Sequence, residues 1–329
     1  RKDVEKAQRY EGSTDEIWAN AKVEGPQPGI ALPDGAIRNW KRYPALRWTV
    51  GPHIRTHVGG PDQFVLYQFW ASIRANIDLW RGLSLQGRIG RDLYNNFHKI
   101  TLESDSVLEH VRSDIASYLK QGANNIVNLE ANYLFSPVPE IYSRISAGYF
   151  EEMFAGYSGE ILHRPFNSRF AIGAEINKVW QREFKQGLGL RKRTQGAYQT
   201  LTGHLNLYYD VPWNNLLASA SIGQFLAGDK GVSYRISRAF DSGVRAGLWV
   251  TLTDVSAEEF GEGSFDKGFY LTVPLELFMT KSSTTYSTFS FRPLTRDGGQ
   301  MLIKKHRLYD VTGISSRREV FHDWHRFMD

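Results

Sequence analysis

The sequence predicts an all-β protein, a transmembrane antiparallel β-barrel of about 14 strands. Segments of about ten residues alternate between apolar and polar side chains, which is the pattern of a strand with one face toward lipid. The connections between these segments alternate between short turns rich in Pro, Asn and Gly and longer charged loops. Outer-membrane barrels have short turns on one side of the membrane and longer loops on the other. We therefore expect short periplasmic turns and longer extracellular loops.

The composition agrees with this fold class. Aromatic residues make up 13% of the chain, and the 9 Trp and 16 Tyr suit the aromatic girdles at the two membrane interfaces. No apolar run approaches the roughly 18 residues of a transmembrane helix, as expected when lipid-facing and lumen-facing residues alternate. A soluble β-sandwich or propeller is the alternative fold. The net charge of +5 is too small to predict a nucleic-acid partner.

The alternation of apolar and polar residues, with its period of two, begins at Ala45. We expect residues 1–44 to be an N-terminal periplasmic or linker segment, 45–312 the barrel, and 313–329 a C-terminal periplasmic tail. Residues 111–119 suit either a strand or a helix, but one added strand would invert the order of turns and loops, so we expect them in a loop. The expected strands are 45–58, 65–77, 83–89, 126–135, 141–150, 156–164, 169–180, 200–210, 216–225, 231–238, 243–253, 268–278, 284–292 and 301–311.

The polar face of the expected strands predicts a basic lumen. Carboxylates on this face are fewer than arginines, and they are Glu130, Glu160 and Glu175. Fixed positive charge in a low-dielectric wall concentrates anions, which predicts an acidic glycan or another anionic solute as the ligand. The alternative is a ladder of internal salt bridges that only stiffens the barrel. The expected lumen arginines are Arg47, Arg55, Arg74, Arg88, Arg144, Arg235, Arg245 and Arg292.

The loops hold the candidates for metal binding or catalysis. Residues 254–268 contain five acidic residues and three glycines. Such a loop suits Ca²⁺, or a glycosidase carboxylate pair with Glu151 and Glu152, but it lacks EF-hand spacing. His53 and His57 lie about 13 Å apart by strand rise, too far for one zinc ion. We therefore expect no metal, no cofactor and no enzymatic activity. The rim-loop residues singled out are Glu151, Glu152, Glu258, Glu259, Glu262, Asp266 and Lys267.

Five stretches of the sequence together carry a family resemblance. They are Val111–Ile115, Gly148–Gly156, Leu226–Gly231, Phe260–Gly268 and Arg292–Gly299. These stretches resemble the bacterial exopolysaccharide and capsule biosynthesis outer-membrane proteins of the YjbH type. The resemblance covers roughly residues 110–312 and implies an outer-membrane β-barrel, usually a lipoprotein, encoded with other polysaccharide-assembly proteins. It implies no catalytic residue.

These observations predict a protein of the bacterial outer membrane that takes part in secretion or surface assembly of an exopolysaccharide, with an Arg-rich lumen for an acidic glycan. The expected partners are the polysaccharide, outer-membrane lipids and other envelope proteins of polysaccharide assembly. Two alternatives stay open. One is a polysaccharide-modifying enzyme with carboxylates at the barrel rim, and the other is a structural surface protein with a plugged lumen.

Overall fold

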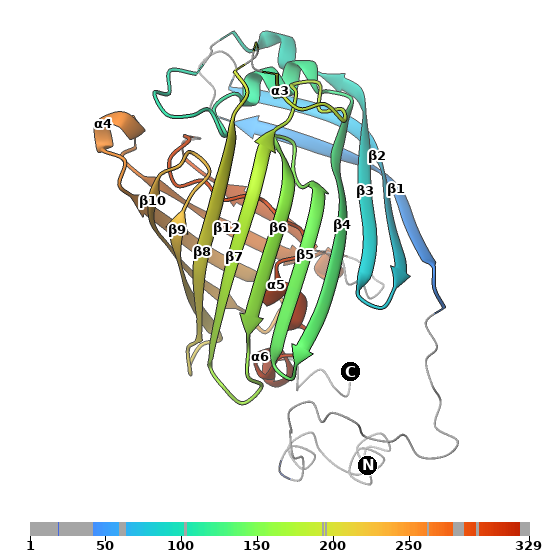
Figure 1. Cartoon of the computed structure of the whole chain (residues 1–329), viewed down its shortest axis with the longest axis vertical. Coiled ribbons are helices and arrows are strands. Elements are labelled where there is room, and N and C mark those ends of the chain that lie inside the picture. Colours follow the sequence, from blue (N-terminus) through green and yellow to red (C-terminus); the bar gives the residue numbers. More distant parts are fainter. Residues whose placement is uncertain are drawn as a thin grey trace.

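The described part of the chain forms one antiparallel sheet of thirteen strands, each paired with its neighbours in sequence (Figure 1). The computed structural model describes residue 19 and residues 42–322, apart from 59–63, 102–103, 193, 195, 262, 279–285 and 294–295. The strands are β1 (Ala45–Val58), β2 (Val65–Trp80), β3 (Leu83–Asn95), β4 (Asn125–Val138), β5 (Ile141–Tyr149), β6 (Phe154–His163), β7 (Phe170–Gln181), β8 (Gln199–Asp210), β9 (Leu216–Gln224), β10 (Lys230–Ala239), β11 (Arg245–Thr253), β12 (Asp266–Pro274) and β13 (Tyr286–Phe291).

Short helices occupy the connections and the C-terminal part. Residues 111–119 are not a strand, and α3 lies in the connection between β3 and β4, as the order of turns and loops predicted. In the described ranges, no helix is long and apolar enough to cross a membrane. The helices are η1 (Phe97–Lys99), α3 (Ile115–Gln121), α4 (Ala257–Phe260), η3 (Leu275–Phe278), α5 (Leu308–Gly313) and α6 (Arg317–His322).

The two faces of the sheet differ in the way that the sequence predicted. Ile172 on β7 and Leu205 on β8 are 44% and 45% exposed, whereas Glu175 and His204 on the same strands are 9% and 3% exposed. The buried face is thus polar and the exposed face is apolar, which is the reverse of a soluble protein. Ile73, Ile145 and Leu248 on other strands are exposed as well.

The sheet curls around residues 299–310, which we call the internal segment. Within this segment, Gln300 Nε2 donates to Asp266 Oδ1 of β12 at 3.2 Å, and His306 Nε2 lies 2.8 Å from Gln86 Oε1 of β3. In a flat sheet these two strands would lie about 43 Å apart, twice the roughly 22 Å that the intervening chain spans when extended. Figure 1 accordingly shows α5 behind β5 and β6, with β10 and β12 on the far side. Among the described residues, no ladder joins β13 to β1.

The predicted strand at 301–311 is wrong. Residues 301–307 have no regular secondary structure and α5 begins at Leu308. The backbone of this segment bonds to side chains of other elements: Arg112 Nη2 donates to the Met301 carbonyl at 2.8 Å, and the Leu308 N–H donates to Glu160 Oε1 at 3.0 Å. Lys304 is buried against the polar face of the sheet. A strand facing lipid would have no place for this basic stretch.

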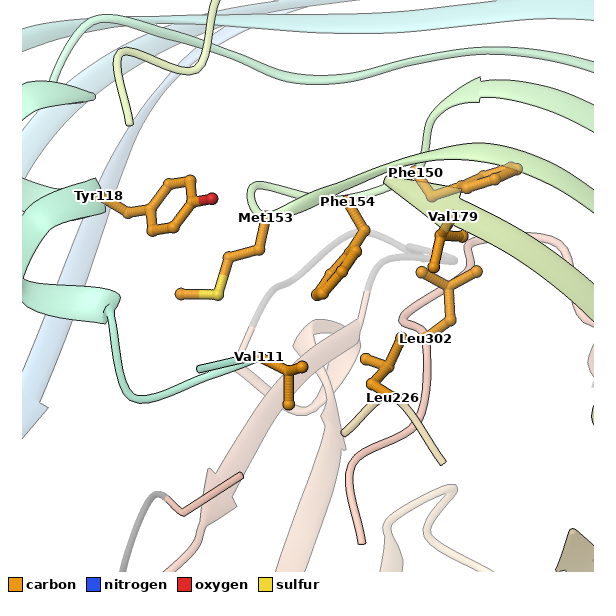
Figure 2. Packing of buried hydrophobic residues seen from close by; sticks show 8 residues of the cluster. All are labelled: Val111, Tyr118, Phe150, Met153, Phe154, Val179, Leu226 and Leu302. Carbon is orange, nitrogen blue, oxygen red and sulfur yellow. The ribbon is translucent and has the colours of Figure 1, made fainter. Parts of the chain in front are cut away.

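Apolar clusters hold the internal segment at both ends of the sheet. At the loop end, where the longer connections lie, Figure 2 shows Val111, Leu226 and Leu302 gathered below Met153 and Phe154. At the turn end, where the short connections lie, Leu308 and Tyr309 pack against Leu162, Ala171 and Tyr208. The Tyr208 and Tyr309 rings stack with centroids 3.8 Å apart. The interior is therefore apolar at its two ends and polar between them.

Candidate functional site

Three of the stretches that resemble the family meet at the loop end. The fully buried Asp297 accepts the backbone N–H of Arg112 at 2.7 Å, and the N–H and hydroxyl of Ser113 at 2.9 and 2.6 Å. Asp229 Oδ2 accepts the N–H of Gly299 at 2.7 Å. Hydrogen bonds to a carboxylate are stronger than neutral ones. These two aspartates therefore fix the entry of the internal segment beneath the loops.

Glu151 belongs to this support and not to an open rim. Its Oε1 lies 3.1 Å from Arg112 Nη1, and both side chains are nearly buried. Burial raises the pKa of Glu151, although the Arg112 guanidinium opposes this effect. Glu152 pairs with Arg55 of β1. The two residues that the sequence offered as rim partners for the acidic loop 254–268 thus each have an arginine partner.

The remaining rim residues do not gather with them. Glu259 forms a capping box with Ser256 at the start of α4 and is exposed, as is Glu258. Lys267 donates to the Gly263 carbonyl at 3.1 Å. Asp266 is buried and accepts the indole N–H of Trp249 at 2.9 Å. Glu262 lies outside the described residues.

A basic cavity lies between the internal segment and the polar face of β10 to β13. Its volume is about 450 Å³. Its lining contains five cationic side chains, two aromatic rings and a set of hydroxyl groups. Among the described residues, it contains one carboxylate. The cations are Arg112, Arg235, Arg292, Lys304 and Arg307; the carboxylate is Asp266; the rings are Trp249 and Tyr270; the hydroxyl groups belong to Ser233, Thr251, Thr272, Thr288 and Ser290.

Two of these cations lack a carboxylate partner in the part of the chain that the structure describes. Arg112 faces Glu151, Arg292 Nε lies 3.0 Å from Asp266 Oδ1, and Lys304 donates to Glu175. No ion pair within 4.0 Å involves Arg235 or Arg307 in the described ranges. Two guanidinium groups without a direct ion pair thus line one cavity, and guanidinium groups bind carboxylates and phosphates. Glu160, Glu175 and Asp310 act on Arg307 electrostatically from beyond 4.0 Å.

The eight predicted lumen arginines do not form one site. Arg235 and Arg292 line the cavity, and Arg245 lies further toward the turn end, where it pairs with Glu319 at 2.8 Å. Arg144 is buried in a structural pair with Glu160 at 3.0 Å.

The other predicted arginines lie on β1 to β3. Arg55 and Arg88 lie over the Trp70 ring, with their guanidinium carbons 5.5 and 4.5 Å from its centroid. Arg74 is opposite Arg88 in the register of β2 and β3. Arg47 pairs with Asp78 at 3.1 Å, and its side chain is 70% exposed.

Part of the buried charge holds the internal segment in place. Lys304 Nζ donates to the Glu175 carboxylate and to Asn177 Oδ1, and His204 Nδ1 lies 3.2 Å from the same carboxylate. Arg144 Nη1 and Nη2 donate to hydroxyl groups of β5 and β6. The ladder that the sequence left open as an alternative therefore exists beside the unpaired arginines. No group of three His, Cys, Asp or Glu residues suited to a metal ion occurs in the described ranges.

Comparison with known proteins places the chain in a family. The YjbH family model, described as "Exopolysaccharide biosynthesis protein YbjH", matches residues 1–313. The chain belongs to this family. It is 39% identical over 267 residues to the "Uncharacterized lipoprotein YjbH" of Escherichia coli (strain K12), a match that covers 80% of this chain and 38% of that protein. The chain thus spans well under half of the length of this relative.

Among solved structures, the chain superposes on the "Salmonella typhi OmpF complex with Daunomycin" with a TM-score of 0.38 and 11% sequence identity. The superposition covers 79% of this chain and 95% of that chain.

Proposed function

We propose that this chain is part of an outer-membrane protein that takes part in secretion or surface assembly of an exopolysaccharide, and that its basic cavity binds acidic groups of the glycan. The observation that carries the proposal is the pair of unpartnered guanidinium groups, Arg235 and Arg307, on one cavity inside the sheet. Membership of an exopolysaccharide biosynthesis family directs the choice of anion toward a glycan.

The exposed apolar face supports the membrane location. The outward side chains Ile145, Leu248 and Ile176 are more than half exposed, and they continue on neighbouring strands. In water, such a surface would drive association. In a bilayer the same surface stabilises the protein, and strands of 9 to 16 residues are long enough to cross the hydrocarbon layer at a tilt. The envelope location and the partners named above follow from this proposal.

The lining of the cavity supports an acidic saccharide in particular. Guanidinium groups bind carboxylates and phosphates through two parallel hydrogen bonds. Hydroxyl groups such as those of Thr251 and Ser290 both donate and accept, as a polyhydroxylated ligand requires. The Trp249 and Tyr270 rings offer flat apolar surface beside these polar groups, which is the usual make-up of a small-molecule site. We propose no catalytic role, because Glu151, Glu152, Glu259 and Asp266 serve separate structural contacts.

The internal segment favours a second candidate, a structural surface protein with a plugged lumen. Its buried pairs with Glu175 and Glu160 resemble a permanent anchor. This candidate requires that Arg235 and Arg307 bind no glycan.

Equilibrium binding of defined oligosaccharides tests the proposal. Purified full-length protein is titrated with oligogalacturonate and with dextran oligomers of equal length. We expect preference for the acidic oligomer and a loss of about tenfold to a hundredfold in affinity in Arg235→Gln/Arg307→Gln, since a hydrogen bond to a charged group contributes about 1.5–3 kcal/mol. The exposed loop residue Lys185, changed to Gln, is the matched control. Equal binding of both oligomers, or full affinity in the double variant, would favour the plugged structural protein.

A further inference from the structure

Three cavities on the inner face of β9 to β12 share lining residues. The basic cavity shares Ser233, Arg235, Tyr270, Met301 and Arg307 with a second cavity of about 80 Å³. A third cavity of about 310 Å³ shares Leu217, Ser237, Tyr270, Tyr309 and Asp310 with the second. Cavities that share five lining residues lie directly beside one another. Tyr270 lines all three of them.

The row of cavities reaches both ends of the sheet. Its first member includes Arg112 and Gln300, which lie beneath the loops. Its last member includes Arg164, which follows β6 at the turn end, and Arg318 of α6. The internal segment forms one wall throughout, because Met301, Arg307 and Asp310 appear in turn along the row.

We infer that the three cavities form one passage beside the internal segment, and that its narrow middle, lined by Arg235, Arg307 and Tyr270, is an anion-selective filter for a single acidic glycan chain. This inference rests on the proposed function, and it specifies where in the interior the glycan moves.

The chemistry of the middle cavity fits a filter. Four serines from β9 and β10 line it with the two arginines, and in the register of these strands Arg235 lies opposite Ser219 and Ser233 opposite Ser221. Serine side chains are small and leave room, and their hydroxyl groups can replace water around a hydrated anion. The stacked rings of Tyr208 and Tyr309 form a fixed wall on the far side.

Basic side chains recur along the whole row. Arg112 and Arg292 lie at its beginning, Arg235 and Arg307 in the middle, and Arg238 and Arg245 at the turn end. Conduction requires several binding sites, each strong enough to attract the ion and weak enough to release it. Arg112, Arg292 and Arg245 each have a carboxylate partner, and Asp310 also lines the middle cavity. A polymer with repeated acidic groups would therefore replace these carboxylates in turn as it passes from one pair of arginines to the next.

The middle cavity is the narrowest of the three, with room for only a few water molecules. In the conformation described, its volume suits small anions and not a glycan chain. A glycan chain therefore requires the side chains of Tyr270 and Arg307 to move aside. Arg307 stands directly before α5, so a shift of that helix would move it.

Ion selectivity in planar bilayers tests the filter with potassium chloride as the probe. The full-length protein is reconstituted, and the reversal potential is measured in a salt gradient. We expect chloride to be favoured over potassium in the wild type, and the permeability ratio to fall at least tenfold in Arg235→Glu/Arg307→Glu. Lys185→Glu adds the same kind of charge change on an exposed loop and should leave the ratio unchanged.

Two further variants test whether a protein without measurable conductance has a closed passage or no passage. Tyr270→Ala widens the narrow part and should raise the conductance, whereas Ser219→Trp/Ser237→Trp fills it and should lower it. Absence of conductance in both wild type and Tyr270→Ala overturns the inference, as does a permeability ratio that the arginine changes leave unaltered. Acidic oligosaccharide binding with no anion selectivity would leave the proposed function standing and refute the filter. Anion selectivity without oligosaccharide binding would refute the proposed function and, with it, the glycan as the molecule that the filter passes.

Discussion

The Asp297 carboxylate accepts the backbone N–H of Arg112 at 2.7 Å, although 185 positions separate the two residues in the sequence. Arg112 in turn donates from its guanidinium to the Met301 carbonyl at 2.8 Å. The first turn of the internal segment is thereby bound to the loop between β3 and β4 through both backbone and side chain. The position of the basic cavity depends on this connection, because Arg112 and Met301 both line it.

Removal of the Asp297 carboxylate should destabilise the loop end. Asp297→Ala leaves the buried N–H groups of Arg112 and Ser113 without an acceptor, so we expect a loss of about 3 kcal/mol in the free energy of unfolding. Asp297→Asn retains one acceptor oxygen and should lose less. Urea unfolding in lipid vesicles measures both, with Asp241→Ala in an exposed turn as the control. An Asp297→Ala variant as stable as this control would show that the connection adds no stability.

The buried pair of Lys304 and Glu175 should show strong coupling. Lys304→Met or Glu175→Gln alone leaves an unpaired buried group, and we expect each to cost about 3–5 kcal/mol. The double variant Lys304→Met/Glu175→Gln removes both charges and should cost less than the sum of the single changes. The pair of Arg47, whose side chain is 70% exposed, with Asp78 serves as the comparison, with an expected coupling below about 1 kcal/mol. Additive effects at Lys304 and Glu175 would mean that the segment is not anchored there.

The sequence predicted most of the sheet because a period of two is a local signal. Thirteen of the expected strands lie where the alternation placed them, including β7 and β8 with the correct faces. The fourteenth expected strand was wrong. Residues 301–311 are mixed in polarity and follow a loop, and both features also belong to the true strands. Lys304, Lys305, His306 and Arg307 stand in succession, and any strand would turn two of them toward lipid. That signal distinguishes the internal segment from a strand.

The basic cavity was only partly predictable. Arg235 and Arg292 were expected on the polar face, and the structure places both on the cavity. Arg112, Lys304 and Arg307 were missed because they come from a loop and from a segment taken for a strand, and their meeting depends on contacts between residues far apart in the chain. The partners that neutralise Arg144 and Arg47 could not be predicted either. The period of two predicts on which face of the sheet a side chain lies, but not which side chain it contacts.

Cysteine labelling should establish the sidedness of the sheet. These 329 residues contain no Cys, so an introduced thiol is unique within them. Gln186, although in a loop, is fully buried and is unsuitable, whereas Leu188 in the same loop and Asn167 in a short turn are exposed. In intact cells a membrane-impermeant maleimide should label Leu188→Cys and spare Asn167→Cys until the outer membrane is permeabilised. Labelling in the opposite order would invert the topology.

Stability should decrease above neutral pH through His110. Its Nδ1 lies 2.8 Å from Asp114 Oδ1, and its Nε2 lies 3.2 Å from the Ser106 carbonyl. Burial lowers the pKa of His110, but these two hydrogen bonds outweigh it, and the pKa lies above the usual 6.5. A raised native pKa stabilises the fold below pH 6.5, and the stabilisation is lost as the pH rises through the native pKa.

Thermal unfolding at a series of pH values measures this effect. The fall of the unfolding temperature from about pH 6 to about pH 8 should be smaller in His110→Asn than in the wild type. His98→Asn, at an exposed position, should retain the wild-type slope. A slope that stays unchanged in His110→Asn would exclude this residue as the origin of the pH dependence.

Charges placed on the apolar face should reveal whether the sheet spans a bilayer. Ile176 and Leu205 lie near the middle of β7 and β8 on the exposed face, and the register sets Ile176 opposite Gly203 and Leu205 opposite Ala174. An Arg at mid-membrane costs about 2–4 kcal/mol, and this cost falls toward zero at the interfaces. Ile176→Arg and Leu205→Arg should therefore each lower the free energy of unfolding in vesicles by that amount, while Leu188→Arg in the loop should change it little. In water, by contrast, an exposed Leu tolerates replacement by Arg, so stabilities equal to the Leu188→Arg control at both sites would show that β7 and β8 do not face lipid.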